Sequence, residues 1–138
     1  MGTRRKSREF ALQALYQWSI TRQDPFLIFD QQKINFSPAD EKDEFAQQVV
    51  VGVLEHYKYI DELIEKFSEH WRLDRISIID RNILRMAVFE LLFREDIPPR
   101  VTLNEAIDLG KRFGSEDSSA FINGILDRIQ KEVIHKSN

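Results

Sequence analysis

The stretch from Ser77 to Leu92 reads SIIDRNILRMAVFELL, and it decides the fold. Its apolar residues cover nearly every side of a helical wheel, so the pattern predicts a helix that is buried almost all round. Serine followed three residues later by an acid, as in Ser77 and Asp80, is a helix-start signal. A helix buried on every side needs other helices around it, and we therefore expect it at the centre of a helical bundle.

Upstream of this stretch, the sequence predicts further helices. Apolar residues at helical spacing indicate a first helix from near Arg4 to near Thr21. A second is expected to begin at Ser37-Pro38, because serine caps a helix and proline fits its first position. A third follows or continues it and carries Trp71 among its apolar residues. The residues between Asp24 and Phe36 are interpreted as a connection, with room for a short helical turn.

Downstream, prolines and a glycine divide the chain. Ile97-Pro98-Pro99 ends the central helix, since proline pushes the preceding residue towards an extended conformation. Thr102 is expected to open the next helix, which ends at Gly114. Ser115 would then cap the last helix, with Glu116 and Asp117 in its first turn, where the helix dipole favours anions.

These signals together predict an all-α protein. We expect a compact bundle of about six or seven helices in two packed helical subdomains, because no strand pattern of any length is visible. A chain of 138 residues suits one domain. The N-terminal half is expected over about 1–72 and the C-terminal half over about 73–138.

Composition and motifs argue against an enzyme. The sequence has no cysteine, which excludes a disulfide framework, a thiolate zinc site and a cysteine nucleophile. Its three histidines show no metal-binding spacing, no phosphate loop is present, and the acidic clusters fall at helix starts or on solvent faces. We therefore expect no cofactor, metal or small-molecule substrate. No apolar run reaches membrane-spanning length and no signal peptide is visible, so we expect a cytoplasmic protein.

Charge distribution is more informative than net charge, which is −3. Four cations lie within the first eight residues, namely Arg4, Arg5, Lys6 and Arg8. Because this run leads directly into a helix, the helix can hold the cations as a fixed patch that binds phosphates. A solvated basic end is the simpler interpretation of the same run.

Asp117 and Phe121 lie on one side of the predicted last helix. The apolar stripe of that helix is formed by Ile122, Ile125, Leu126, Ile129 and Val133. Phe121 falls about 100° away from Ile122 on a helical wheel. An aromatic ring beside a helix start can stack on an unpaired base. Packing against a neighbouring helix explains the same pattern, and periodicity alone slightly favours it.

The start of the central helix carries a further cluster of charges. Asp80 lies in the first turn, where we expect it to be exposed, and Arg81 and Arg85 share a flank four residues apart. Simple capping is the favoured interpretation from the residues alone. A charged helix end can also serve as a contact for a protein partner.

Taken in order, five stretches resemble the NusB family. They are Arg4–Tyr16, Asp80–Leu91, Val101–Ile107 preceded by Ile97-Pro98, Lys111–Gly114 and Asp117–Asp127. Each stretch is weak as a single motif, but their order along almost the whole chain is highly specific. Residues 25–36 carry no resemblance.

The resemblance implies a transcription antitermination factor made of two helical bundles. Family members pair with NusE, a small-ribosomal-subunit protein, and the pair binds single-stranded boxA RNA in the nascent transcript during ribosomal RNA synthesis by the RNA polymerase antitermination complex. The resemblance assigns RNA contacts to Arg4, Arg5, Lys6, Arg8, Asp117 and Phe121. It assigns NusE contacts to Tyr16 and Asp80. Lys6 stands where the family often has arginine, so it keeps the charge but not the planar fork.

Two rival functions come from other classes. Similar helical domains form the RNA-binding part of RNA cytosine methyltransferases, but this sequence lacks the Gly-rich nucleotide-binding turn and the catalytic cysteine of such an enzyme. A helical adaptor that binds only protein is the other rival. Measuring RNA binding at two salt concentrations separates the adaptor from an RNA-binding protein.

Overall fold

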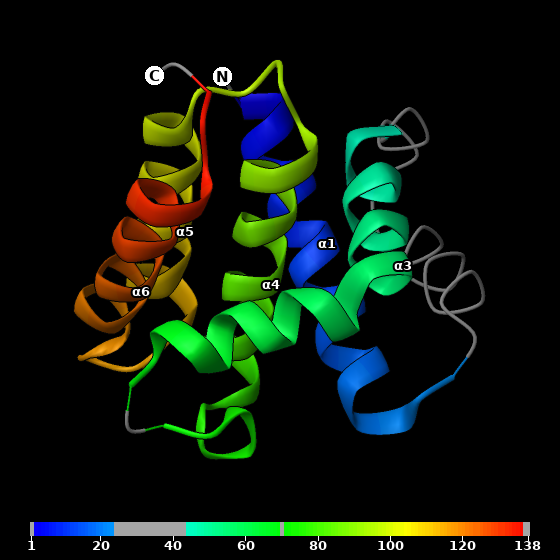
Figure 1. Ribbon diagram of the computed structural model, residues 1–138. Coiled ribbons are helices and arrows are strands. Elements are labelled where there is room, and N and C mark those ends of the chain that lie inside the picture. The colour runs from blue at the N-terminus through cyan, green and yellow to red at the C-terminus, as the bar shows by residue number, and fades with distance from the viewer. Residues whose placement is uncertain (1, 24–43, 70, 137–138) are drawn as a thin grey trace. The chain divides into compact units, whose positions relative to one another are not determined.

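The computed structural model describes residues 2–23, 44–69 and 71–136, and the described chain is all-helical (Figure 1). No strand occurs within these ranges. The five α-helices and the single 3₁₀ turn of the described chain are α1 (Gly2–Thr21), α3 (Glu44–Phe67), η2 (Leu73–Arg75), α4 (Ile78–Phe93), α5 (Pro99–Phe113) and α6 (Ser118–Val133). The predicted all-α class is therefore confirmed.

The described residues contain fewer helices than the six or seven that the sequence predicts for the chain. The second and third predicted helices are one continuous element in the described residues, α3. The predicted start at Ser37-Pro38 and the connection before it lie outside the described residues. Trp71 was expected on the apolar face of the third helix, but it lies beyond the end of α3.

The contacts within the chain define two compact units, Met1–Glu55 and His56–Asn138. The boundary falls inside α3, whereas the sequence places it near residue 72. Organisation as a single domain with halves of about 1–72 and 73–138 remains a prediction.

The first unit contains α1 and the beginning of α3. The apolar stripe predicted for α1 is buried, with Ala11 and Leu15 fully covered and Trp18 nearly so. The beginning of α3 also buries its apolar residues, Val49 and Val53 among them. Burial of each such side chain contributes roughly 1.5–3 kcal/mol relative to exposure.

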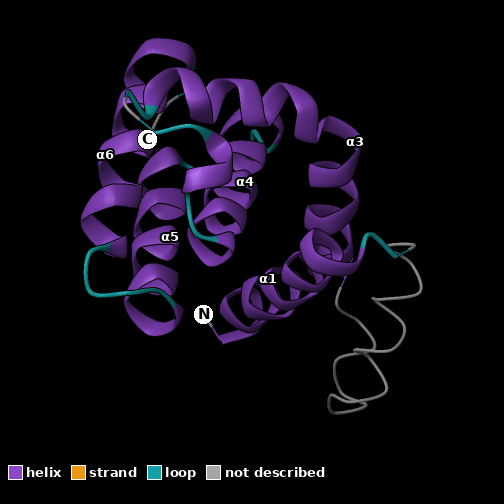
Figure 2. Cartoon of the chain, turned by 90° about the horizontal axis from the view of Figure 1, so that it is seen from below, coloured by secondary structure: helices purple, strands orange, loops and turns teal. Residues whose placement is uncertain are grey.

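The second unit contains the end of α3 and the helices α4, α5 and α6, of which the last three pack on one another in pairs (Figure 2). Every residue of α4 from Asn82 to Leu91 is buried, as the apolar pattern predicts. On α6 the predicted stripe from Ile122 to Ile129 is buried, while Val133 is half-buried. None of the helices in the described ranges combines the length and apolar composition that a bilayer crossing needs.

Helix starts follow the sequence signals at α4 but not at α5. Ser77 is the N-cap of α4, and its Oγ accepts the Asp80 N–H at 3.1 Å. Helix α5 begins at Pro99, three residues before the predicted start at Thr102. Proline needs no N–H partner in a first turn, so it starts this helix. Thr102 is instead buried, and its Oγ1 donates to Glu90 Oε1 at 2.9 Å.

Candidate functional site

The basic run lies inside α1, so the helix holds its cations in fixed directions. Arg4 and Lys6 are exposed and Arg5 is half-buried. The guanidinium groups of Arg4 and Arg8 lie 4.6 and 5.1 Å from the ring centroid of Phe45, within cation–π range. Arg8 is only 4% exposed, which leaves the surface of the run to Arg4, Arg5 and Lys6.

Tyr16 is further along α1 and is 37% exposed. Its ring is therefore available to a partner, in contrast to Leu15 beside it, which is fully buried. The structure thus gives the first unit both an exposed cationic surface and an exposed tyrosine, and their assigned roles remain predictions.

A tight turn between α5 and α6 positions the start of α6. Gly114 is the C-cap of α5, as predicted, and its N–H donates to the Gly110 carbonyl at 3.0 Å. A Cβ at Gly114 would lie 2.3 Å from Ser118 Oγ, so only glycine fits here. The prediction that Ser115 caps α6 is wrong: the Ser115 N–H donates to Ser118 Oγ at 2.8 Å, and the N-cap is Asp117.

Asp117 is exposed, and its side chain makes no capping hydrogen bond. Its carboxylate is therefore available at the positive end of the helix dipole. One turn later, Phe121 is half-buried, while its neighbour Ile122 is fully buried. This difference in burial agrees with the predicted wheel position of Phe121, about 100° away from Ile122.

The Phe121 ring lies against a second, exposed aromatic ring. The Trp71 ring lies 6.4 Å from the Phe121 ring at an interplanar angle of 79°, an edge-to-face arrangement. Trp71 is 49% exposed. The expectation that Trp71 belongs to an apolar core stripe is therefore wrong, because the chain leaves α3 before it reaches this residue.

These two rings border a pocket of about 230 Å³ in the second unit. The residues around it include Trp71, Arg75, Ser77, Asp80, Asp117 and Phe121. The structure thus brings together three residues that the family resemblance assigns to two different partners. Sequence reasoning missed Trp71 and Arg75, although a tryptophan followed by arginines between two helices is a signal that could have been used.

Asp80 differs from the prediction in its exposure. It is 8% exposed, not a surface residue, although it lies in the first turn of α4 as expected. Its Oδ1 atom is buried and has no hydrogen-bond partner within the described ranges. A buried carboxylate oxygen without a partner is costly. This oxygen is therefore a candidate acceptor for a group that enters the pocket.

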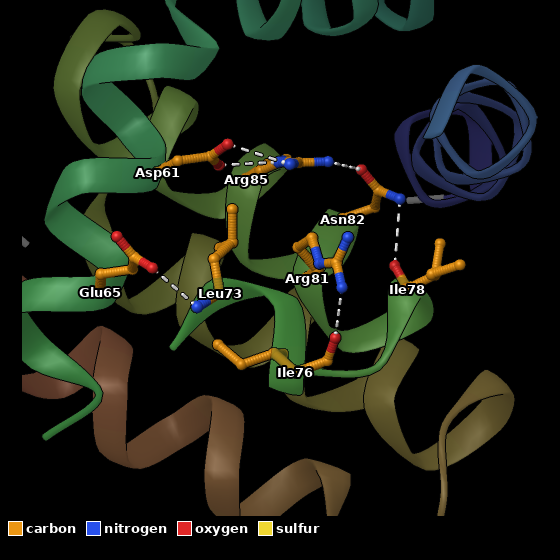
Figure 3. A network of polar contacts seen from close by, with 8 residues as sticks. All are labelled: Asp61, Glu65, Leu73, Ile76, Ile78, Arg81, Asn82 and Arg85. Atoms are coloured by element: carbon orange, nitrogen blue, oxygen red, sulfur yellow. Dashed lines mark hydrogen bonds and ion pairs between the residues drawn. The ribbon is translucent and has the colours of Figure 1, made fainter. Parts of the chain in front are cut away.

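Arg85 also differs, because it is 2% exposed and cannot serve as a surface contact. Figure 3 shows its guanidinium between two partners. It donates to both oxygens of Asp61 at 2.8 and 3.0 Å and to Asn82 Oδ1 at 3.0 Å. Asn82 in turn donates to the Ile78 carbonyl at 3.0 Å. This bidentate pair joins α3 to α4.

Two further bonds fix the segment that carries the wall of the pocket (Figure 3). Arg81 Nη2 donates to the Ile76 carbonyl at 2.8 Å, and Glu65 Oε2 accepts the Leu73 N–H at 2.8 Å. Both bonds hold η2, which places Arg75 beside the pocket. Arg81 and Arg85 therefore support the site rather than form it.

The described residues contain no group of histidine and acidic side chains arranged to hold a metal ion. The pocket instead offers aromatic faces, one exposed guanidinium and two carboxylates. These groups can stack on a ring, attract a phosphate and accept hydrogen bonds.

Comparison with known proteins shows which family the chain resembles. The chain matches the model of the NusB family over residues 5–131. It is 48% identical over 133 residues to the transcription antitermination protein NusB of Myxococcus xanthus (strain DK1622), which aligns 94% of this chain with 95% of that protein.

Solved structures show the same likeness. NusB of T. maritima superposes with a TM-score of 0.88 at 41% identity, covering 96% of this chain and 93% of that one. A chain in a crystal structure of antitermination factors NusB and NusE in complex with dsRNA superposes with a TM-score of 0.83 at 32% identity, covering 95% and 98%.

Proposed function

The chain belongs to the NusB family of transcription antitermination proteins, and on that premise we propose that it binds single-stranded, boxA-type RNA together with NusE. In this role it acts on the nascent transcript within the RNA polymerase antitermination complex and supports ribosomal RNA transcription. Its work is assembly, with no bond made or broken. Bacterial transcripts are made in the cytoplasm, so the proposal places the protein there.

The observation that carries the proposal is the position of Phe121. Its ring is off the buried stripe of α6, half-exposed, and in edge contact with the exposed ring of Trp71. Aromatic rings at a surface pocket are the groups that hold unstacked bases of single-stranded RNA. Asp117, exposed at the start of the same helix, is the second proposed RNA contact on this side.

The basic run on α1 is proposed to attract the phosphates. The exposed cations Arg4 and Lys6, with the half-buried Arg5, offer charge at the surface. Arg8 was assigned the same role, but its burial against Phe45 leaves it less surface for a phosphate. We expect the three more exposed cations to carry most of the salt dependence of binding.

NusE is proposed to contact Tyr16, and the family resemblance assigns Asp80 to NusE as well. Tyr16 is exposed and can meet a protein surface directly. Asp80 is buried beside the pocket, so whichever of the two partners contacts it, NusE or RNA, must bring a group that enters the pocket. If the protein and NusE contact the same RNA strand, the partner that binds second does so within an existing complex. The affinity of the pair for RNA then exceeds that of either protein without any additional interaction.

A mixing experiment tests the proposal. Native mass spectrometry of the protein, its NusE and a boxA-type RNA should show a ternary complex that persists at concentrations where either pair dissociates. The matched control is an RNA of the same length and composition with the boxA order scrambled. A ternary complex that forms equally well with the scrambled RNA would contradict boxA recognition. A NusE complex that never takes up RNA would support a protein-only adaptor.

A further inference from the structure

We propose that the pocket beside Asp80 takes a single unstacked nucleobase, and that Trp71, Arg75 and Asp80 are RNA-binding residues in addition to Asp117 and Phe121. The proposal rests on the RNA binding proposed above and names the residues that recognise one base. Guanine is the best match, because its ring N–H and its amino group lie side by side on one edge, so either donor can reach the unpartnered Asp80 Oδ1.

Size and shape favour one ring system. The pocket holds about 230 Å³, which is less than the roughly 300–1,000 Å³ of pockets that hold drug-sized ligands. Trp71 and Phe121 border it with their rings at 79° to one another. A planar base can stack on the face of one ring while the edge of the other closes the side. Stacking of this kind is the main way in which proteins bind single-stranded bases.

Polar groups at the pocket match a nucleotide. Asp80 Oδ1 is buried without a hydrogen-bond partner in the described part of the chain, and Asp80 borders the pocket. Such an oxygen gains from a base that brings an amino or ring N–H group. Arg75 is exposed at the same pocket, and its cation suits the phosphate attached to that base.

The surrounding bonds show that the pocket is held in place before any ligand arrives. Arg81 and Glu65 fix the backbone on either side of η2, and Ser77 caps α4 through the Asp80 backbone. Asp80 keeps its cap when its side chain is changed, because the capping donor is the backbone N–H. The carboxylate is therefore not needed for capping, which leaves it available for recognition.

The first experiment compares exposed aromatic residues by RNA titration. Trp71→Ala should weaken binding of the boxA-type RNA by roughly 5- to 150-fold, the range for loss of one stacked base. Tyr59→Ala is the matched control, since Tyr59 is 48% exposed against 49% for Trp71 and does not border the pocket. Trp71→Leu guards against misfolding, and a thermal melt of each variant reports its stability.

The second experiment compares two arginines of one segment. Arg75→Ala should weaken RNA binding, whereas Arg72→Ala should not, because Arg72 is exposed beside Asp74 and does not border the pocket. Equal effects of the two changes would show a general charge effect and would overturn a specific role for Arg75.

The third experiment tests the base. Replacing each guanine of the RNA in turn with inosine removes one amino donor, and at one position it should weaken binding to the wild type about tenfold or more. The same replacement should have little effect on RNA binding by the Asp80→Ala variant. This variant should be at least as stable as the wild type, because an unpartnered carboxylate is removed. A loss that is equal in both proteins would overturn the hydrogen bond.

The outcomes separate this inference from the proposed function. If the wild type with NusE binds no boxA-type RNA, the proposed function fails. If it binds RNA and the Trp71, Arg75 and Asp80 variants bind equally well, only the pocket inference fails. If these variants lose affinity for NusE in the absence of RNA, the pocket holds a group of the protein partner, and the inference is overturned.

Discussion

Two largely buried carboxylates of the second unit, Asp61 and Asp80, differ in their hydrogen bonds and therefore in their roles. Asp61 is 15% exposed and accepts both arms of Arg85, so both of its oxygens are satisfied. Asp80 is 8% exposed, yet its Oδ1 atom lacks a partner in the described ranges. Both carboxylates are largely removed from solvent, but within the described residues only Asp61 has hydrogen-bond partners for both oxygens. The satisfied carboxylate holds the fold together, and the unsatisfied one borders the pocket that we assign to RNA.

The arginines differ in the same way. Arg85 commits its guanidinium to Asp61 and Asn82 and is almost fully buried. Arg75 is exposed beside the pocket. A charged side chain near α4 is therefore a candidate for binding only if the protein leaves its hydrogen-bonding capacity unused.

The largest expected effect is on the satisfied pair. Arg85→Ala should lower the free energy of unfolding by about 3–5 kcal/mol, because it leaves the charge of Asp61 without compensation. Urea denaturation measures the change. The double variant Asp61→Leu with Arg85→Met should recover most of the loss, since neither charge then remains.

An exposed ion pair is the control for this prediction. Lys131 and Asp127 form a pair on the surface of α6, at 68% and 41% exposure. Lys131→Ala should cost only about 0.3–0.5 kcal/mol. If Arg85→Ala lowers the free energy of unfolding by no more than this, the Asp61–Arg85 pair does not stabilise the fold. The contrast drawn between Asp61 and Asp80 would then be wrong.

The next effect concerns the pocket. Phe121→Ala should lower RNA affinity by about 1–3 kcal/mol, because one base loses its stacking partner. Its cost in unfolding free energy should stay well below the ~3–5 kcal/mol of a buried phenylalanine. Urea melts and RNA titrations of this variant give both numbers. The reverse order, with stability reduced and affinity per folded molecule kept, would place Phe121 in the core.

A smaller effect distinguishes the role of the Asp80 backbone N–H, which is capped by Ser77, from that of the Asp80 carboxylate. Ser77→Ala removes the acceptor for the Asp80 N–H and should cost about 1 kcal/mol of stability. RNA affinity per folded molecule should not change, because the carboxylate remains. A thermal melt beside an RNA titration decides the matter, and a fall in affinity alone would show that the cap aligns the carboxylate for binding.

The smallest effect at moderate salt is expected on α1. Replacing Arg4 and Arg5 with alanine should weaken RNA binding and flatten the plot of log K against log salt by about 0.7 for each phosphate that the variant no longer neutralises. Arg22→Ala is the control, since Arg22 is an exposed cation that follows α1 and stacks on Trp18. An unchanged slope in the double variant would show that the basic run is only a solvated end.

Local patterns predicted the helices well because they depend on neighbouring residues. The apolar run of α4, the Ser77 cap and the Gly114 end of α5 were all confirmed. The family resemblance also selected Asp117 and Phe121, which do lie together at the pocket.

The errors concern interactions between residues distant in the sequence. Arg85 meets Asp61 across 24 positions, and no helical period carries that information. The exposure of Asp80 was predicted from its place in a first turn, but a buried environment depends on the segments packed over it. Trp71 was placed on a helix that ends before it, so its exposed ring was mistaken for a core residue.

The close approach at Gly114 links RNA recognition to a residue that no ligand needs to touch. A methyl group there would lie 2.3 Å from Ser118 Oγ, 2.6 Å from Ser118 Cβ and 2.8 Å from the Gly110 carbonyl oxygen. Any larger residue must shift the start of α6, and Asp117 and Phe121 would move with it. A genetic screen for impaired RNA binding should therefore recover substitutions at Gly114. Suppressors are expected at Ser118, where glycine would relieve two of the three clashes.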